Sequence, residues 1–137
     1  MYIPLILALL IVTAQSYPWD HSATVEDCIK KEELVESTLK IYQYLQHPMV
    51  PSDDDEYNKF YGCYWKSIGL LDKFGNVDVE KIDNFFANYR GLKIPKNNRE
   101  EAIEKCKNFH GGTCGQKAVK TYNCINLYFS ELGLLKS

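Results

Sequence analysis

The sequence predicts a small all-α domain, a compact bundle of about six helices held together by disulfides. Three observations predict this class. Apolar residues recur at steps of three and four along most of the chain, no segment alternates as a half-buried strand does, and five cysteines follow an apolar leader. Cysteines of this kind are typical of an oxidising compartment. With 137 residues, the chain is long enough to bury one core and short enough for cross-links to matter.

Residues 1–16 have the character of a signal peptide. They carry no charged side chain, contain an apolar run over residues 3–12, and end in small residues. The run is shorter than the about 20 residues that a membrane-spanning helix needs, so a cleaved leader is favoured over an anchor. We expect cleavage before Tyr17, secretion of the mature chain, and one helical domain over residues 17–137.

Two helices are predicted in the first half of the mature chain. The first carries an apolar stripe at helical spacing, formed by Val35, Leu39, Tyr42 and Leu45. Pro48 and Pro51 end it, because proline cannot continue a helix. The second runs over residues 54–71 and presents the stripe Tyr57, Tyr61, Tyr64, Ile68 and Leu71. Its N-terminal cap comes from Ser52, Asp53 and Asp54.

Three further helices follow the turn at residues 72–76. The first repeats the helical spacing with Val79, Ile82, Phe86 and Tyr89. The second, over residues 98–108, is rich in helix formers and buries only a narrow stripe around Ile103 and Cys106. Gly111 and Gly112 close it. The last helix runs over residues 113–132 and ends at Gly133, with an inward face of Ala118, Tyr122, Ile125 and Phe129.

The sequence offers no pattern for catalysis, metal binding or nucleic-acid binding. The formal charge is −2, and lysines and acids are interspersed without a long basic stripe. No Gly-x-Ser-x-Gly elbow, phosphate loop, His-Glu-x-x-His or Cys-x-x-Cys motif is present. The three histidines and the cysteines also lack zinc-site spacing. We therefore expect a protein that is not an enzyme, with no cofactor, no metal, no nucleic-acid partner and no membrane span.

The cysteines carry the most specific signal in the chain. They are Cys28, Cys63, Cys106, Cys114 and Cys124. An odd number leaves one thiol that is either free or paired between chains, and spacing alone does not give the connectivity.

These spacings resemble the insect odorant-binding protein family, which comprises the pheromone-binding and general odorant-binding proteins. The most similar segment spans residues 63–82: it opens with Cys63-Tyr64-Trp65, has Gly69 six residues after the cysteine, and continues through Gly75-Asn76-Val77. The family pattern has six cysteines, and its second one falls here on Lys59. The resemblance extends over residues 28–132 and identifies the chain as an atypical five-cysteine member.

The resemblance implies a disulfide pairing. Its pattern joins Cys28 to Cys63 and Cys106 to Cys124, and leaves Cys114 as a free thiol because Lys59 replaces its partner. The bridge between the third and later helices is then absent, and we predict a looser, more adaptable pocket. The simplest interpretation of Cys114 itself is a buried small apolar residue, four residues before Ala118 on the same face.

The resemblance also implies six helices around a hydrophobic cavity that carries a small hydrophobic molecule, an odorant, pheromone or lipid, through aqueous fluid. The ten tyrosines, six phenylalanines and two tryptophans fit this picture. Most of them build a core, and a few tyrosine hydroxyls at a cavity rim suit an amphiphilic guest. Residues on the inward stripes are predicted to line the cavity: Tyr64, Ile68, Phe85, Phe86, Tyr89, Ala118, Tyr122 and Ile125.

Two other uses of the same scaffold stay open. One is a salivary, venom or seminal scavenger of host mediators such as biogenic amines or lipids, in which Glu80, Asp83 or Glu131 faces a ligand ammonium. The other is a structural or interaction protein in which Cys114 links two chains. We expect a monomer or weak dimer, with a chemoreceptor or a host mediator as the encounter partner.

Overall fold

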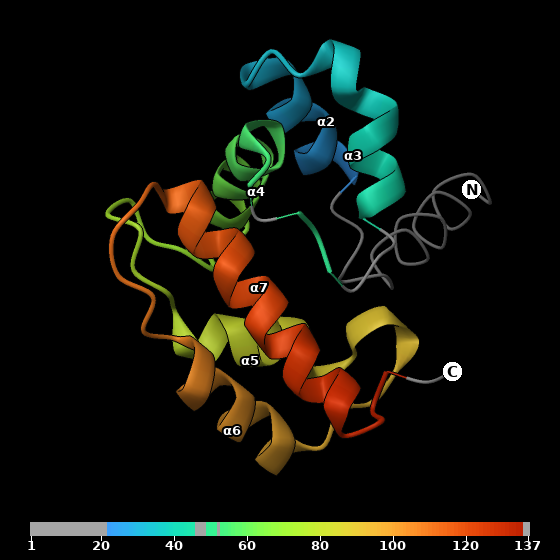
Figure 1. The fold of residues 1–137 in the computed structure, drawn as a ribbon, viewed down its shortest axis with the longest axis vertical. Helices are drawn as coiled ribbons and strands as arrows, with labels where there is room; N and C mark the ends of the chain where they lie inside the picture. The colour runs from blue at the N-terminus through green and yellow to red at the C-terminus, as the bar shows by residue number, and fades with distance from the viewer. Residues whose placement is uncertain (1–21, 46–48, 52, 136–137) are drawn as a thin grey trace, which may run out of the picture.

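The computed structural model describes residues 22–45, 49–51 and 53–135. Within these ranges the protein contains six α-helices, two 3-10 turns and one isolated bridge between Leu71 and Val77. The predicted all-α fold is therefore confirmed (Figure 1). The predicted signal peptide lies outside the described residues.

The first described helix, α2 (Ser22–Lys31), is one that the apolar pattern does not predict. Val25, Cys28 and Ile29 lie on one face at helical spacing and are buried. The helix packs against α4, to which the Cys28–Cys63 disulfide joins it.

The structure of the next segment differs from the predicted helix with its apolar stripe. It consists of a 3-10 turn, η1 (Val35–Ser37), followed by the short helix α3 (Thr38–Tyr44). Val35, Leu39 and Tyr42 are 69%, 86% and 38% exposed, whereas Ile41 is 1% exposed and faces the core. The prediction that Val35, Leu39 and Tyr42 face inward is wrong. A 3-10 turn has about three residues per turn, so the helical phase does not carry through from Val35 to α3.

Helix α4 (Asp55–Ser67) is the central aromatic helix. Asp54 caps it, because its side chain accepts hydrogen bonds from the backbone N–H groups of Glu56 and Tyr57. The buried aromatic residues are Tyr57, Phe60, Tyr61, Tyr64 and Trp65. The helix ends before the predicted boundary at residue 71, since Gly69 takes a left-handed backbone with φ of 83°.

A tight turn leads into α5 (Val79–Ala87). The carboxylate of Asp72 closes the turn by accepting hydrogen bonds from the N–H groups of Phe74 and Asn76. Asp78 then caps α5 at the N–H of Lys81. The chain leaves α5 through the 3-10 turn η2 (Tyr89–Gly91), in which Arg90 has φ of 56°.

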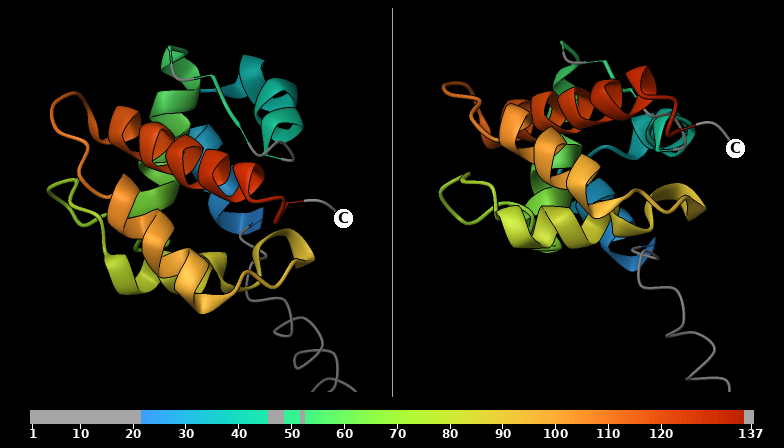
Figure 2. Two further views of the ribbon diagram at one scale, coloured as in Figure 1. Left: turned by 60° about the horizontal axis from the view of Figure 1, so that its bottom comes forward. Right: turned by 90° about the horizontal axis from the view of Figure 1, so that it is seen from below.

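The last two helices are α6 (Lys96–Cys106) and α7 (Cys114–Glu131). Thr113 and Gln116 form a reciprocal capping box at the start of α7. Figures 1 and 2 show α7 crossing α4, with α6 lying alongside α7. The Cys106–Cys124 disulfide joins α6 to α7. The two disulfides thus tie α2 to α4 and α6 to α7, and neither joins α4 to α7.

Asp54 provides a test of the α4 cap. Partial burial raises the pKa of its carboxyl, but the ammonium of Lys40 and the N–H of Tyr57 outweigh this and hold that pKa below its usual value. Replacing Asp54 by Ala should lower the free energy of unfolding by about 1 kcal/mol at neutral pH. Denaturant unfolding of the variant and the wild type over a range of pH measures this difference.

The sign of the pH dependence follows from the lowered pKa. A carboxyl with a depressed folded-state pKa stabilises the protein above its unfolded pKa of about 4 and loses this contribution as the pH falls through the folded value. The difference between wild type and Asp54→Ala should therefore shrink in acid. Asp53→Ala is the matched control, because Asp53 is exposed and does not cap the helix. A pH-independent difference would contradict this account.

Candidate ligand-binding site

The inward faces of α4, α5 and α7 meet in one group of aromatic rings, which we call the aromatic cluster. It consists of Tyr61, Tyr64, Trp65, Phe85, Phe86, Tyr89, Tyr122 and Phe129. Five of the eight residues predicted to line a cavity belong to it. Ala118 and Ile125 are fully buried on the same face of α7, and Ile68 is half-buried at the end of α4.

Tyr122 lies at the centre of the aromatic cluster. Its ring centroid is 5.5 Å from that of Tyr61, 6.4 Å from Trp65, 6.5 Å from Phe86 and 6.3 Å from Tyr89. These separations lie in the range at which aromatic rings attract one another. Tyr122 therefore connects three helices, and the rings pack against one another in this structure.

Polar atoms lie inside this apolar environment. The hydroxyls of Tyr89 and Tyr122 are hydrogen-bonded at 2.5 Å, and the side-chain amide of Asn126 donates to the carbonyl of Tyr122 at 2.8 Å. Burial raises the pKa of the hydroxyls of Tyr61, Tyr89 and Tyr122, and the positive charge of Arg90 opposes this rise. The three hydroxyls therefore stay neutral at physiological pH.

Two buried polar atoms in this region have no hydrogen-bond partner among the described residues. They are Nε1 of Trp65, a donor, and Oδ1 of Asn126, an acceptor. Both side chains are 0% exposed. A buried polar atom without a partner costs about 1–3 kcal/mol, so native interiors contain few of them. Trp65 packs against the ring of Tyr122, and Asn126 bonds to the backbone carbonyl of the same residue, so both unpartnered atoms belong to residues that contact Tyr122.

The sequence pattern identifies only some of the residues in and around the aromatic cluster. It misses Arg90 and Asn126, and it names Tyr61 and Trp65 only as parts of a helix or motif. A signal for Asn126 was present, because it follows Ile125 and so borders the inward face of α7. Arg90 gives no such signal, since it belongs to a turn whose backbone conformation no apolar period describes.

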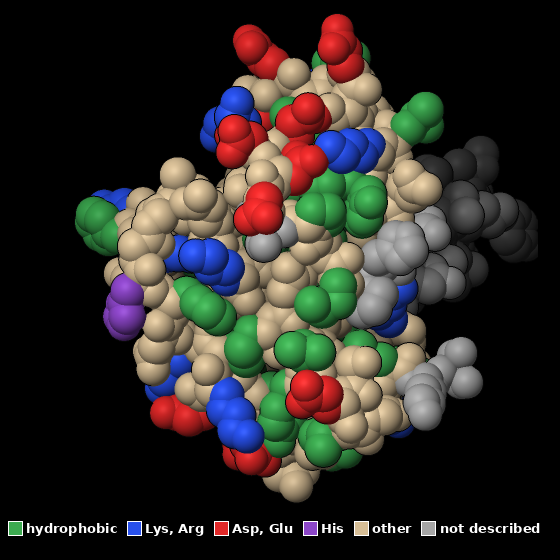
Figure 3. Space-filling model, viewed as in Figure 1, with side chains coloured by type: hydrophobic (Ala, Val, Ile, Leu, Met, Phe, Trp, Pro, Cys, Tyr) green, Lys and Arg blue, Asp and Glu red, His purple; other side chains and the backbone are tan. Residues whose placement is uncertain are grey.

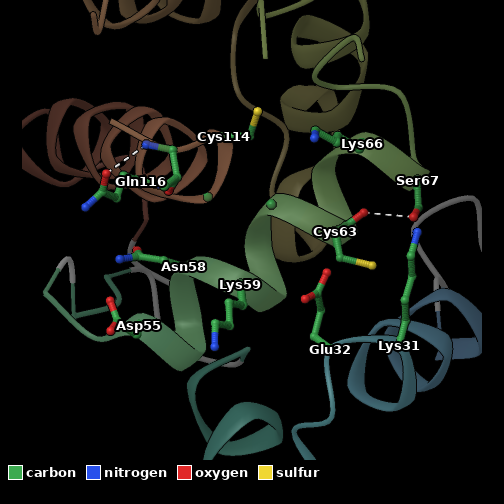
Figure 4. Close-up of a pocket in the computed structure, with 13 residues that line it drawn as sticks. Lys31, Glu32, Asp55, Asn58, Lys59, Cys63, Lys66, Ser67, Cys114 and Gln116 are labelled. Atoms are coloured by element: carbon green, nitrogen blue, oxygen red, sulfur yellow. Dashed lines mark hydrogen bonds between the residues drawn. The ribbon is translucent and has the colours of Figure 1, made fainter. Parts of the chain in front are cut away.

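A polar groove of about 530 Å³ lies outside the aromatic cluster. It is bounded by the end of α2, one side of α4 and the start of α7 (Figure 4). Its charged lining residues are Lys31, Glu32, Asp55, Lys59 and Lys66. None of the eight predicted lining residues contributes to it. A second groove of about 330 Å³, beside Phe109 and Lys117, is also lined by other residues.

The polar groove contains the position of the missing family cysteine. Lys59 and Cys114 both line it, and Figure 4 shows their side chains pointing in different directions. Cys114 is the free thiol, and it is half-buried rather than buried. Its sulfur lies so close to Gly75 that a β-carbon at that glycine would be 2.8 Å away. The thiol thus faces the turn before α5 and not Lys59.

Charged side chains are unevenly distributed on the face of the protein that Figure 3 shows. On the face in Figure 3, acidic side chains gather at the end formed by α2, α3 and the start of α4, and both signs mix over the rest. Among the described residues, no group of three or more His, Cys, Asp or Glu side chains is placed to hold a metal ion. No helix in the described ranges has the length and apolar character needed to cross a membrane.

The protein is thus a small all-α domain with two disulfides among its described residues and an aromatic interior that holds buried hydroxyls. A model of the PBP/GOBP family matches residues 20–127. The chain therefore belongs to this family, the pheromone-binding and general odorant-binding proteins of insects, as the cysteine pattern predicts. Its members carry small hydrophobic molecules, are not enzymes and are typically secreted.

A solved structure confirms the fold. The chain is similar to a fatty acid binding protein, OBP56a, from the oral disk of the blowfly Phormia regina, with a TM-score of 0.64 and 21% sequence identity. The similarity covers 80% of this chain and 89% of the blowfly protein. No curated protein sequence matches the chain.

Proposed function

We propose that this protein is a secreted, non-catalytic carrier that binds one small hydrophobic guest within the aromatic cluster between α4, α5 and α7. One observation carries the proposal: the rings of three helices converge on Tyr122, and Trp65 and Asn126 beside it each bury a polar atom that has no partner. An amphiphilic guest gains affinity by burying apolar area and adds hydrogen bonds to such atoms.

A guest enters this packed interior by displacing rings. The disulfide arrangement supports such movement, because α2–α4 and α6–α7 are separately cross-linked pairs. The family bridge that would involve Cys114 is absent, so no covalent link holds α4 at a fixed distance from α7. We infer that the two pairs separate slightly around the guest, which is the adaptable pocket that the missing cysteine predicts.

The scavenger of biogenic amines receives less support from the acids considered for it. Asp83 pairs with Arg99 at 2.9 Å, and Glu80 and Glu131 are exposed. A buried ammonium needs an opposite charge to offset its desolvation. The positive charge of Arg90 beside the tyrosine hydroxyls opposes a cationic guest further. The carrier of neutral or acidic amphiphiles is therefore the favoured function.

The test uses Trp65 as an internal reporter. The second tryptophan of the chain is Trp19, so a Trp19→Phe variant of the oxidised mature protein leaves Trp65 as the single indole. We expect fatty acids, alcohols and esters to change Trp65 emission on titration. The same guests should displace a fluorescent apolar probe over the same range of guest concentration. Biogenic amines should do neither.

Two matched truncations locate the guest. Phe85 belongs to the aromatic cluster, whereas Phe109 borders the second groove, and both are half-buried. Phe85→Ala should change guest affinity by several-fold, and Phe109→Ala should leave it unchanged. Probe displacement without any change in Trp65 emission, or equal effects of the two truncations, would refute binding in the cluster. Displacement by amines alone would favour the scavenger.

A further inference from the structure

Charge is divided unevenly along the chain. Residues 22–56, which include α2, η1, α3 and the start of α4, carry nine acids and three lysines, a net charge of −6. Residues 57–137 carry eight acids and thirteen lysines and arginines, a net charge of +5. Asp20 supplies the one remaining negative charge. The formal charge of −2 is therefore the sum of an acidic region and a basic region.

The acidic region carries a solvent-exposed apolar surface, which we call the α3 surface. It consists of Val35, Leu39 and Tyr42. Leu39 is 86% exposed and lies on the same side of α3 as Tyr42, three residues further on. Because η1 runs directly into α3, Val35 precedes Leu39 by about one turn. Single exposed apolar side chains are common, but three within eight residues form a patch that can bury area against another molecule.

Several acids beside the α3 surface lack a paired cation, and acidic side chains gather at this end of the molecule (Figure 3). Four exposed acids form no ion pair with any described residue: Glu33, Glu36, Asp53 and Asp55. The lysine of α3, Lys40, instead pairs with Asp54 and lies 5.0 Å from the ring centroid of Tyr57. On α6, by contrast, acids pair with lysines three or four residues away. The α3 surface is therefore apolar with an acidic rim.

The second groove, of about 330 Å³, lies in the basic region. Its basic lining residues are Lys107, His110 and Lys117. No acid lines it, and Val79 and Phe109 supply apolar lining. Lys107 pairs with Glu104 at 2.8 Å, whereas Lys117 forms no ion pair with any described residue. The groove therefore combines apolar walls with an unopposed cation.

The two surfaces lie on opposite sides of the molecule. Figures 1 and 2 show α3 on one side and, on the other, the loops that lead into α5 and α7 and border the second groove. Asp72 and Asp78 belong to the first of these loops, but their carboxylates accept hydrogen bonds from backbone N–H groups. Each molecule therefore presents an acidic apolar surface and a basic groove that two neighbours can contact at the same time.

We propose that the α3 surface of one copy docks into the second groove of another, so that copies of this protein associate head to tail. In this contact Leu39 is buried against Val79 and Phe109, and the acids beside α3 approach Lys117. The contact is independent of the proposed function, because neither surface belongs to the aromatic cluster.

Other occupants fit the α3 surface less well. A symmetric contact between two α3 surfaces brings their acids together, and like charges across a contact oppose association. An anionic lipid surface repels the same acids. A head-to-tail contact is heterologous, so each pair leaves one α3 surface and one groove free for a further copy. The contact is small, and we expect weak, concentration-dependent association that does not stop at a dimer.

Sedimentation velocity of the oxidised mature protein, without guest or probe, tests this contact. Between about 10 µM and about 1 mM, the average mass should rise above the monomer at low salt and fall back in about 0.5 M salt, which screens the charges. Leu39→Gln and Lys117→Glu should each weaken association by about tenfold. The matched controls are Leu127→Gln and Lys120→Glu, because Leu127 and Lys120 are exposed on α7 and do not line the groove. Thermal unfolding checks that all four variants are folded.

An equimolar mixture of the two variants gives the decisive result. Leu39→Gln keeps its groove and Lys117→Glu keeps its α3 surface, so the mixture should form a one-to-one dimer with wild-type affinity and no larger species. A monomeric wild type, wild-type association in Lys117→Glu, or equal losses in the controls overturns the head-to-tail contact.

Two other outcomes also overturn it and name a different occupant or bond. A dimer that persists in high salt and disappears in Cys114→Ala is linked by a disulfide. Co-sedimentation with phosphatidylserine vesicles that Leu39→Gln abolishes assigns the α3 surface to a membrane. None of these outcomes bears on the guest site, because no guest is added.

Discussion

Removing the Cys28–Cys63 disulfide by replacing both cysteines with alanine is expected to lower the free energy of unfolding by about 3–4 kcal/mol. The bridge closes a loop between positions 35 residues apart, and without it the unfolded chain regains the entropy of that loop. The loss is a large share of the about 5–15 kcal/mol by which a typical domain is stable. The bridge also fixes α2, a short helix of 10 residues, to α4.

Denaturant unfolding followed by circular dichroism measures this effect, and Cys114→Ala is the control. Cys114 forms no bridge, so its replacement should change the free energy of unfolding by less than about 1 kcal/mol. Titration of the denatured, unreduced wild type should find one thiol per chain. A loss below about 1 kcal/mol in the double variant would contradict the expected role of the bridge, and more than one thiol would contradict the pairing.

Gly115→Ala should destabilise the protein by about 3 kcal/mol, although alanine is the better helix former. Gly115 lies where α7 crosses α4, and a β-carbon there would be 1.8 Å from the carbonyl oxygen of Asn58 and 2.4 Å from its carbon. The obstacle is backbone, so it cannot rotate away as a side chain does. The two helices would have to move apart, and the rings of the aromatic cluster would lose contact.

Two further variants make this prediction specific. Ser130→Ala is in the same helix at an exposed position, so it reports helix propensity alone and should be neutral or slightly stabilising. Gly62→Ala would approach Gly115 only to 3.0 Å and should cost less than Gly115→Ala. Thermal unfolding of the three variants gives the order of their stabilities. A Gly115→Ala protein as stable as Ser130→Ala would refute the close crossing of α4 and α7.

The effect of Gly115→Ala can also be measured at the aromatic cluster. Because α4 carries Tyr61, Tyr64 and Trp65 and α7 carries Tyr122, the distance between these helices sets the room within the aromatic cluster. A folded Gly115→Ala protein should therefore show altered Trp65 emission before any guest is added. This change would separate an effect on the site from a general loss of stability.

Much of the helical framework could be read from the sequence, because buried helices carry apolar residues at a period that the chain displays directly. Helices α4, α5, α6 and α7 lie where these patterns place them, and the Thr113 cap agrees with the predicted start of α7. The pattern fails in the segment around α3. There the stripe of Val35, Leu39 and Tyr42 faces solvent, because a 3-10 turn interrupts the helical phase and Ile41 takes the buried position.

The residues of the candidate site also fall into two groups, those that the sequence pattern identifies and those that it does not. The aromatic members on inward stripes, such as Phe86 and Tyr122, are visible in the sequence because burial and periodicity coincide in them. Arg90 is not visible, since its place beside Tyr89 depends on one left-handed backbone residue in η2. Nor can a sequence tell that Trp65 and Asn126 each bury an atom without a partner, because hydrogen bonding depends on all neighbours at once.

By itself the sequence determined the all-α class, the resemblance to the odorant-binding proteins and the inward aromatic stripes, since periodicity, composition and cysteine spacing are properties of the linear chain. The tertiary structure alone decided which rings meet at Tyr122, that Arg90 stands beside their hydroxyls, and that Cys114 faces Gly75 while Gly115 brings α7 against α4. These are contacts between distant segments, and they depend on the angles and distances at which helices cross, which no local pattern encodes.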